Sequence, residues 1–142
     1  MTDYRYQGGC HCGAIGFSMR LPKPLTDYSP RACDCDYCTQ HGAAYLSDPD
    51  GQLTLRVHDA TLLSRYRQGS GIADFWVCKR CGVLVAVSHE ADDTLYATVN
   101  SRAMKDTDQL TDSQCVSPKL LPDSEKITRW QAIWFHHVRV EP

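Results

Sequence analysis

The chain has 142 residues, a length that suits one domain, and its 42% hydrophobic and 23% charged residues are ordinary for a globular protein. A formal net charge of -2 offers no basic field for nucleic acid, and no apolar run approaches the roughly 20 residues that span a bilayer. Because the first residues also lack the apolar core of a signal peptide, we expect a cytoplasmic protein with neither nucleic acid nor a membrane as partner.

Short segments of alternating apolar and polar residues dominate the first hundred positions. Residues 14–21 and 52–57 follow the two-residue period of a half-buried strand. Further strands are expected at residues 62–67, 72–77, 83–88 and 95–99. Turn signals rich in Pro, Gly and Asp separate them, at residues 22–24, 48–51, 69–71 and 92–93. Many short strands with frequent turns predict an all-β domain.

The last third of the chain is less regular. Residues 101–106 are expected to form a helical turn and residues 113–125 a loop. Helical spacing relates four residues beyond that loop, namely Trp130, Ile133, Trp134 and His137. Residues 135–140 fit a strand equally well, and we favour a closing strand.

Seven of the eight cysteines fall into three clusters. The clusters are Cys10-His11-Cys12-Gly13, Cys33-Asp34-Cys35-Asp36-Tyr37-Cys38 and Cys78-Lys79-Arg80-Cys81-Gly82. In a reducing cytosol, clustered thiols are more often metal ligands than disulfide partners. Pairs separated by a single residue also suit two ligands of one ion. We therefore interpret these seven as metal ligands and Cys115 as a free thiol, with zinc ligation by Cys115 as the alternative.

The first and third clusters together predict one closed zinc site. A glycine follows each cluster and permits a tight turn, and each cluster precedes a predicted strand. Two such pairs form one tetrahedral site when neighbouring strands bring their ends together. We assign Cys10, Cys12, Cys78 and Cys81 to a structural zinc, because four thiolates leave no vacant position on the metal.

The middle cluster is different, because it supplies only three thiolates. Cys33, Cys35 and Cys38 leave a fourth position, and an open position distinguishes a catalytic zinc from a structural one. His41 follows two residues after the last cysteine and could close the site as a fourth ligand. We favour the other interpretation of His41, a partly exposed loop residue.

The three clusters resemble the glutathione-dependent formaldehyde-activating enzyme family, also called the GFA or CENP-V family, over about residues 6–104. Gly8-Gly9 ahead of the first cluster, Gly42-Ala43, Phe75 and Val99-Asn100 support the resemblance. It implies an Mss4-like β-tent of short antiparallel strands organised around two zinc ions, one structural and one functional. It also implies a carbon-sulfur lyase that forms S-hydroxymethylglutathione from glutathione and formaldehyde.

Two classes of function follow from these patterns. The first is an enzyme that acts on thiol-aldehyde adducts, with a small thiol or its adduct as partner, and the open middle cluster favours it. The alternative is a zinc-stabilised binding module in which both metals are structural.

Four cations near the clusters or the last strand could bind the carboxylates of glutathione, but we interpret them as solvated surface charges: Arg31, Lys79, Arg80 and Arg102. Residues 107–142 match no named pattern and are expected to pack on the same domain.

Overall fold

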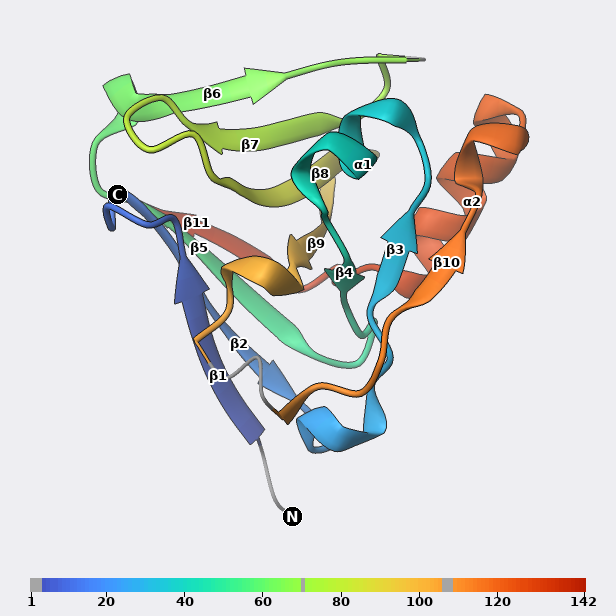
Figure 1. The fold of residues 1–142 in the computed structure, drawn as a ribbon, viewed down its shortest axis with the longest axis horizontal. Coiled ribbons are helices and arrows are strands. Elements are labelled where there is room, and N and C mark those ends of the chain that lie inside the picture. Colours follow the sequence, from blue (N-terminus) through green and yellow to red (C-terminus); the bar gives the residue numbers. More distant parts are fainter. Residues whose placement is uncertain (1–3, 70, 106–108) are drawn as a thin grey trace.

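The structure, a computed structural model, describes residues 4–69, 71–105 and 109–142. Two β-sheets form its framework (Figure 1). The smaller sheet has the strand order β1 (Tyr4–Gly9), β2 (Ile15–Leu21), β5 (Gln52–Val57) and β11 (Val138–Glu141). The larger sheet has the order β10 (Gln114–Val116), β3 (Arg31–Cys33), β4 (Tyr45–Leu46), β9 (Thr94–Asn100), β8 (Leu84–Ala91), β7 (Asp74–Cys78) and β6 (Leu63–Tyr66).

Strand pairing confirms the predicted fold class of short, mostly antiparallel strands, and it adds two parallel strand pairs. Most neighbouring strands are antiparallel, but β11 pairs with β5 and β10 pairs with β3 in the parallel direction. Both parallel strands come from the last third of the chain, so the C-terminal segment adds an edge strand to each sheet. The described residues also form two α-helices, α1 (Asp36–His41) and α2 (Asp123–Ile133). In the described part of the chain, no helix has the length and apolar character needed to cross a membrane.

The alternating segments were predicted well. β5 has the predicted bounds, and β2 begins one residue later than predicted. The strand predicted at 62–67 is shorter, because a 3-10 turn at Ala60–Leu62 precedes β6. β8 continues three residues past its predicted end, where two aspartates with positive φ, Asp92 and Asp93, form the turn to β9.

The predictions for the last third were partly wrong. Residues 113–125 do not form a continuous loop, because they contain β10, a 3-10 turn at Pro118–Leu120 and the start of α2. The proline and the acidic residues of this segment mark the start of a helix and not a loop. Pro122 is the N-cap of α2, and Asp123 and Glu125 lie in its first turn, where negative charge is favourable. The helical spacing holds for Trp130 and Ile133, because α2 ends at Ile133 with Trp134 as its C-cap and His137 lies beyond it. The closing strand is confirmed but shorter than predicted, since β11 begins at Val138. The turn predicted at 101–106 is the 3-10 turn Ser101–Ala103, and residue 106 lies outside the described residues.

Apolar side chains fill the space between the two sheets. Phe17 of β2, Leu55 of β5 and Trp76 of β7 are almost fully buried in this core. A second group of buried residues lies where α1 and α2 meet the larger sheet, and it includes Phe75 and Trp134. The larger sheet is therefore covered on both faces, which explains why Leu84–Ser88 of β8 is buried without alternation.

Candidate metal centres and the adjoining pocket

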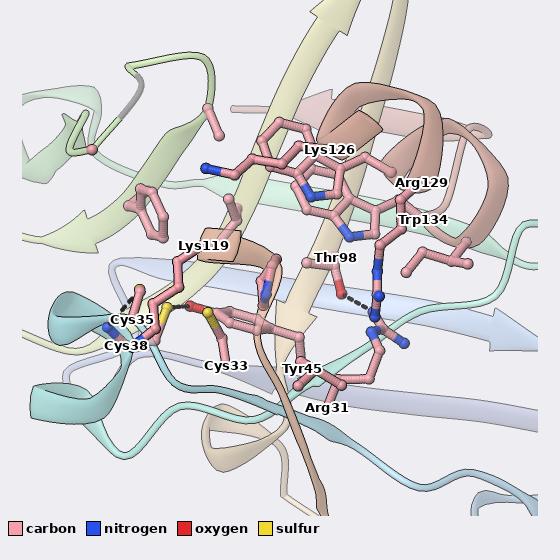
Figure 2. A pocket seen from close by; sticks show the side chains of 18 of the residues that line it. Arg31, Cys33, Cys35, Cys38, Tyr45, Thr98, Lys119, Lys126, Arg129 and Trp134 are labelled. Atoms are coloured by element: carbon pink, nitrogen blue, oxygen red, sulfur yellow. Dashed lines mark hydrogen bonds between the residues drawn. The ribbon is translucent and has the colours of Figure 1, made fainter. Parts of the chain in front are cut away.

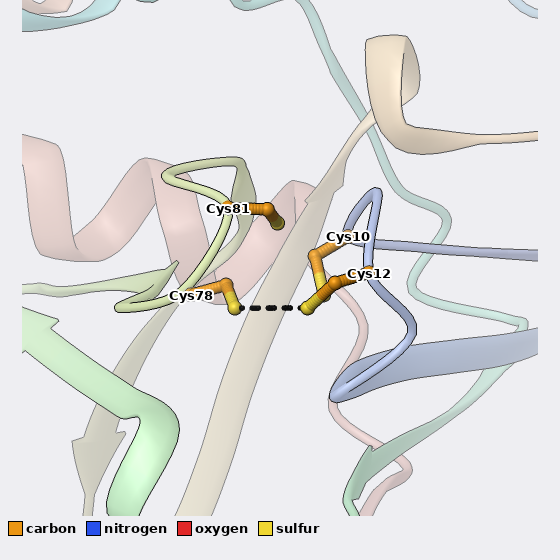
Figure 3. Close-up of side chains that lie close together, drawn as sticks. All are labelled: Cys10, Cys12, Cys78 and Cys81. Carbon is orange, nitrogen blue, oxygen red and sulfur yellow. Dashed lines mark hydrogen bonds between the residues drawn. The ribbon is translucent and has the colours of Figure 1, made fainter.

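The cysteines of the first and third clusters lie together where the two sheets meet (Figure 3). Cys10 and Cys12 are in the turn between β1 and β2, whereas Cys78 and Cys81 flank the turn between β7 and β8. Their four sulfur atoms all lie within 4.8 Å of one another, and the Sγ atoms of Cys12 and Cys78 are 3.5 Å apart. Because each hairpin belongs to a different sheet, this four-cysteine group joins the two sheets.

Backbone geometry at both turns brings the cysteines into place. Gly13 and Gly82 have φ angles of +85° and +77°, a region that glycine adopts without strain. The N–H of Cys10 donates to the carbonyl of Ile15 at 2.8 Å, and the N–H of Ile15 donates back to the Cys10 sulfur at 3.3 Å. The glycines noted in the sequence therefore allow the turns through which an amide group reaches a sulfur atom.

Electrostatics at the four-cysteine group favour a bound cation. Burial raises the pKa of the Cys10 thiol to about 11. The backbone N–H of Ala14, in contrast, lowers the pKa of Cys12. Several thiolates cannot share so small and partly buried a volume without a positive charge between them. Four free thiols at this spacing could hold a metal ion that prefers sulfur ligands.

The middle cluster forms a second group of sulfur atoms around the start of α1. Cys33 ends β3, and Cys35 is the N-cap of the helix, where its sulfur accepts a hydrogen bond from the N–H of Cys38 at 3.4 Å. Cys35 and Cys38 are three residues apart and thus face the same way from the helix turn. All three sulfur atoms lie within 4.8 Å of one another, so this three-cysteine group could also hold a metal ion.

Hydrogen bonds within the three-cysteine group give its thiols different pKa values. The side chain of Cys38 lowers the pKa of Cys33 to about 6, and the same interaction, together with burial, raises the pKa of Cys38. The Tyr45 hydroxyl lies 3.0 Å from the Cys38 sulfur. Burial raises the pKa of Tyr45, so its hydroxyl keeps its proton and can donate it to a Cys38 thiolate.

The two remaining candidate ligands lie outside these groups. His41 is the exposed last residue of α1, with its ring centroid 4.6 Å from that of Tyr37. It is not part of the three-cysteine group found among the described residues. Cys115 is exposed in β10 and belongs to neither group. The structure thus brings together the seven cysteines grouped from the sequence, and their role as metal ligands stays a prediction.

A cavity of about 160 Å³ opens beside the three-cysteine group, and Cys33, Cys35 and Cys38 all line it. The larger sheet supplies apolar side chains to its lining, including Tyr45, Phe75 and Val87, and the opposite wall carries Trp130 and Trp134. Figure 2 shows the cysteines on one side of this cavity and a pair of arginines on the other. Four cations take part in the lining: Arg31, Lys119, Lys126 and Arg129.

The interpretation of Arg31 as a solvated surface charge was wrong. The side chain is half-buried and lines the cavity, and its Nη2 donates to Ser47 Oγ at 2.8 Å and to Thr98 Oγ1 at 3.3 Å. Burial, and then the neighbouring charge of Arg129, lowers the pKa of Arg31 to about 10. The other three candidates, Lys79, Arg80 and Arg102, are exposed, as interpreted.

Sequence reasoning missed the part of the site that comes from the C-terminal segment. Lys126, Arg129, Trp130, Ile133 and Trp134 all line the cavity from α2 and the residue that follows it. Their spacing of three and four residues is that of one helical face. The sequence pattern therefore indicated a helix with one such face. Nothing local in the sequence shows that this face packs beside Cys33, Cys35 and Cys38.

Comparison with known proteins agrees with this architecture. The sequence model of the glutathione-dependent formaldehyde-activating enzyme family matches residues 5–117, and the chain belongs to this family. Among solved structures, the chain is similar to the crystal structure of a Rhodobacter sphaeroides protein, with 26% sequence identity and a TM-score of 0.55. That similarity covers 78% of this chain and 99% of the other. The matched family region ends before α2, so the helical wall of the cavity lies beyond it.

Proposed function

We propose that the protein binds two zinc ions and catalyses the addition of a thiol to an aldehyde, with glutathione and formaldehyde as its substrates. The four-cysteine group would hold a structural zinc, and Cys33, Cys35 and Cys38 a functional one. The observation that carries this proposal is the cavity, which opens on the three-cysteine group.

We also propose that residues 1–142 form one domain, because α2 contributes Trp130 and Ile133 to the packing around the second core cluster.

The reaction adds the S–H group of the thiol across the C=O bond of the aldehyde. A sulfur-carbon bond forms, the C=O double bond becomes a single bond, and the thiol proton ends on the oxygen. The reverse reaction makes the enzyme a carbon-sulfur lyase. Zinc, when bound, stabilises a thiolate at neutral pH and can polarise a carbonyl oxygen.

The residues around the three-cysteine group have separate roles in this scheme. Tyr45 holds the Cys38 sulfur through its hydroxyl. Trp130 and Trp134 stack with ring centroids 4.7 Å apart and present apolar surface to the cavity. The cations of the cavity lining attract an anionic substrate.

The activity is tested by measuring how fast glutathione and formaldehyde exchange with their adduct. Two-dimensional exchange NMR at equilibrium, with and without the zinc-loaded protein, gives this rate directly. We expect the protein to raise the exchange rate in proportion to its concentration. Two zinc ions in a folded protein that leaves the rate unchanged with every thiol tested would instead support the binding module with both metals structural.

Metal content provides a first prediction. Protein prepared under reducing, zinc-replete conditions is expected to contain two zinc ions per chain, because seven cysteines form two groups with ligand spacing. Elemental analysis with a thiol count checks this. One zinc per chain would fit a labile three-cysteine group, whereas less than one, with the thiols oxidised, would contradict the metal proposal.

Loss of the Tyr45 hydroxyl provides a second prediction. Tyr45→Phe is expected to weaken metal binding at the three-cysteine group by roughly ten- to hundredfold, as is typical for partners of metal ligands. Competition with a chromophoric chelator measures both sites, and the four-cysteine group should be unaffected. Tyr28→Phe is the matched control, because the buried Tyr28 hydroxyl donates to Asp48 at 2.7 Å, away from either sulfur group. Equal metal affinity in both variants would contradict the role of Tyr45.

A further inference from the structure

Two arginines meet in the cavity on the side away from the cysteines. Arg31 belongs to β3 and Arg129 to α2, and Figure 2 shows the Arg129 side chain extending toward the guanidinium of Arg31. Both side chains are half-buried. Two like charges in a partly desolvated site repel each other, so an arrangement of this kind is unfavourable unless an anion lies between them.

Neutral groups hold Arg31 in place without cancelling its charge. Ser47 Oγ accepts from Arg31 and donates its own hydrogen to the Ile133 carbonyl at 2.7 Å. Thr98 Oγ1 likewise accepts from Arg31 and donates to the Leu46 carbonyl at 2.9 Å. Each hydroxyl uses its hydrogen on a backbone carbonyl and accepts a hydrogen bond from Arg31. These contacts therefore place the guanidinium group but leave its positive charge uncancelled. The guanidinium is positioned before any ligand binds, which lowers the entropy cost of binding.

No protein carboxylate neutralises this end of the cavity, as far as the described residues show. Neither Arg31 nor Arg129 forms an ion pair there, and no aspartate or glutamate lines the cavity. Lys126 adds a third positive charge, whereas Lys119 lies 3.9 Å from an Asp34 carboxylate oxygen. The uncompensated charge is thus concentrated around the two guanidinium groups.

We propose that Arg31 and Arg129 form a subsite for a carboxylate of the substrate. Guanidinium groups bind carboxylates with two parallel hydrogen bonds, which a planar anion with two oxygens matches best. The substrate is then a thiol, or its aldehyde adduct, that carries a carboxylate on the side of the cavity away from the cysteines. This inference rests on the proposed function for the position of the sulfur.

The distance between Arg31 and Cys33 along β3 is short enough for one small molecule to contact both the arginine pair and the three-cysteine group. Arg31 and Cys33 are two residues apart and so face the same side of the strand, roughly 7 Å from each other along the backbone. Trp130 and Trp134 line the same cavity with apolar surface. A mercapto acid, or a peptide thiol bound through one carboxylate, has the required combination of groups.

The subsite can be tested with two matched pairs of probes on the zinc-loaded full chain. The first pair, 3-mercaptopropionate and 3-mercaptopropionamide, differs only in the carboxylate. The second pair, 3-phenylpropionate and its amide, contains no sulfur and tests the subsite independently of the metal. Tryptophan fluorescence reports binding, since Trp130 and Trp134 line the cavity. We expect each acid to bind at least about tenfold more tightly than its amide.

Variants then assign the preference to the two arginines. Arg129→Gln and Arg31→Gln should each abolish the preference for the acid, whereas Arg5→Gln, on exposed β1 surface, should keep it. Arg129→Gln carries the test if Arg31→Gln fails to fold. Equal binding of acid and amide, no response to either acid, or a preference that survives Arg129→Gln would overturn the subsite. Displacement of the acids by inorganic phosphate at equal concentration would also overturn its assignment to a carboxylate.

The two probe pairs separate this inference from the proposed function. Cobalt substituted for zinc reports whether a thiol reaches the metal. If neither thiol changes the cobalt spectrum but 3-phenylpropionate keeps its preference, the proposed function fails and the subsite stands. If both thiols change the spectrum with equal affinity, the subsite fails and the proposed function stands.

Discussion

Replacing Cys78 or Cys10 by serine is expected to leave little folded protein. Both residues are buried in the four-cysteine group, which joins turns of two different sheets and links residues 66 positions apart in the chain. A structural zinc contributes on the order of 10 kcal/mol, comparable with the 5–15 kcal/mol that stabilise a whole domain. Soluble yield and thermal melting followed by circular dichroism measure the loss.

Cys115→Ser is the control for this prediction, because Cys115 is exposed and outside both groups. It should melt cooperatively at the temperature of the unaltered protein. A Cys78→Ser variant that is soluble and melts with the same cooperativity would show that the four-cysteine group is not needed for the fold.

Cys35→Ser is expected to have the opposite outcome, a folded protein without activity. Cys35 caps a helix of six residues, so its loss disturbs only the local turn around α1. Removing one of three sulfur ligands should reduce the exchange of glutathione with formaldehyde to the rate in buffer alone. Exchange NMR measures the activity, and the melting curve of the same sample confirms that it is folded.

Cys115→Ser again provides a cysteine-to-serine change, at a residue that neither lines the cavity nor belongs to a sulfur group, and should keep full activity. If Cys35→Ser keeps its activity, catalysis does not depend on the three-cysteine group. If Cys35→Ser loses soluble protein as completely as Cys78→Ser, the division into a structural and a functional group is wrong.

Local patterns explain why the sulfur groups could be predicted. Cysteine spacing and the glycines at 13 and 82 act within single turns, and the strands that carry these turns show clear alternation. Once β2 and β7 are recognised, the pairing of the first and third clusters needs only that their hairpins meet. The three clusters therefore follow from short-range information, whereas the contact between the first and third is a long-range one, across 66 residues from Cys12 to Cys78.

The cavity depends on contacts that no local pattern contains. β3 and β4 have three and two residues, too short for a visible period, and β10 lies in a segment rich in turn-forming residues. Arg31 looks like a surface charge until Ser47 and Thr98 are seen to hold it in place. The helical face of α2 was recognisable, but its position beside β3 is a long-range result of packing.

The most direct test of the proposed function is a thiol titration of the cobalt-substituted protein. An open position at the three-cysteine group predicts a change in the cobalt-thiolate absorption that saturates with glutathione or a simpler thiol. The change should be absent in Cys35→Ser, while the absorption of the four-cysteine group persists. No response to any thiol, with His41→Ala then creating one, would show that His41 closes the site and would contradict the proposal of an exchangeable position.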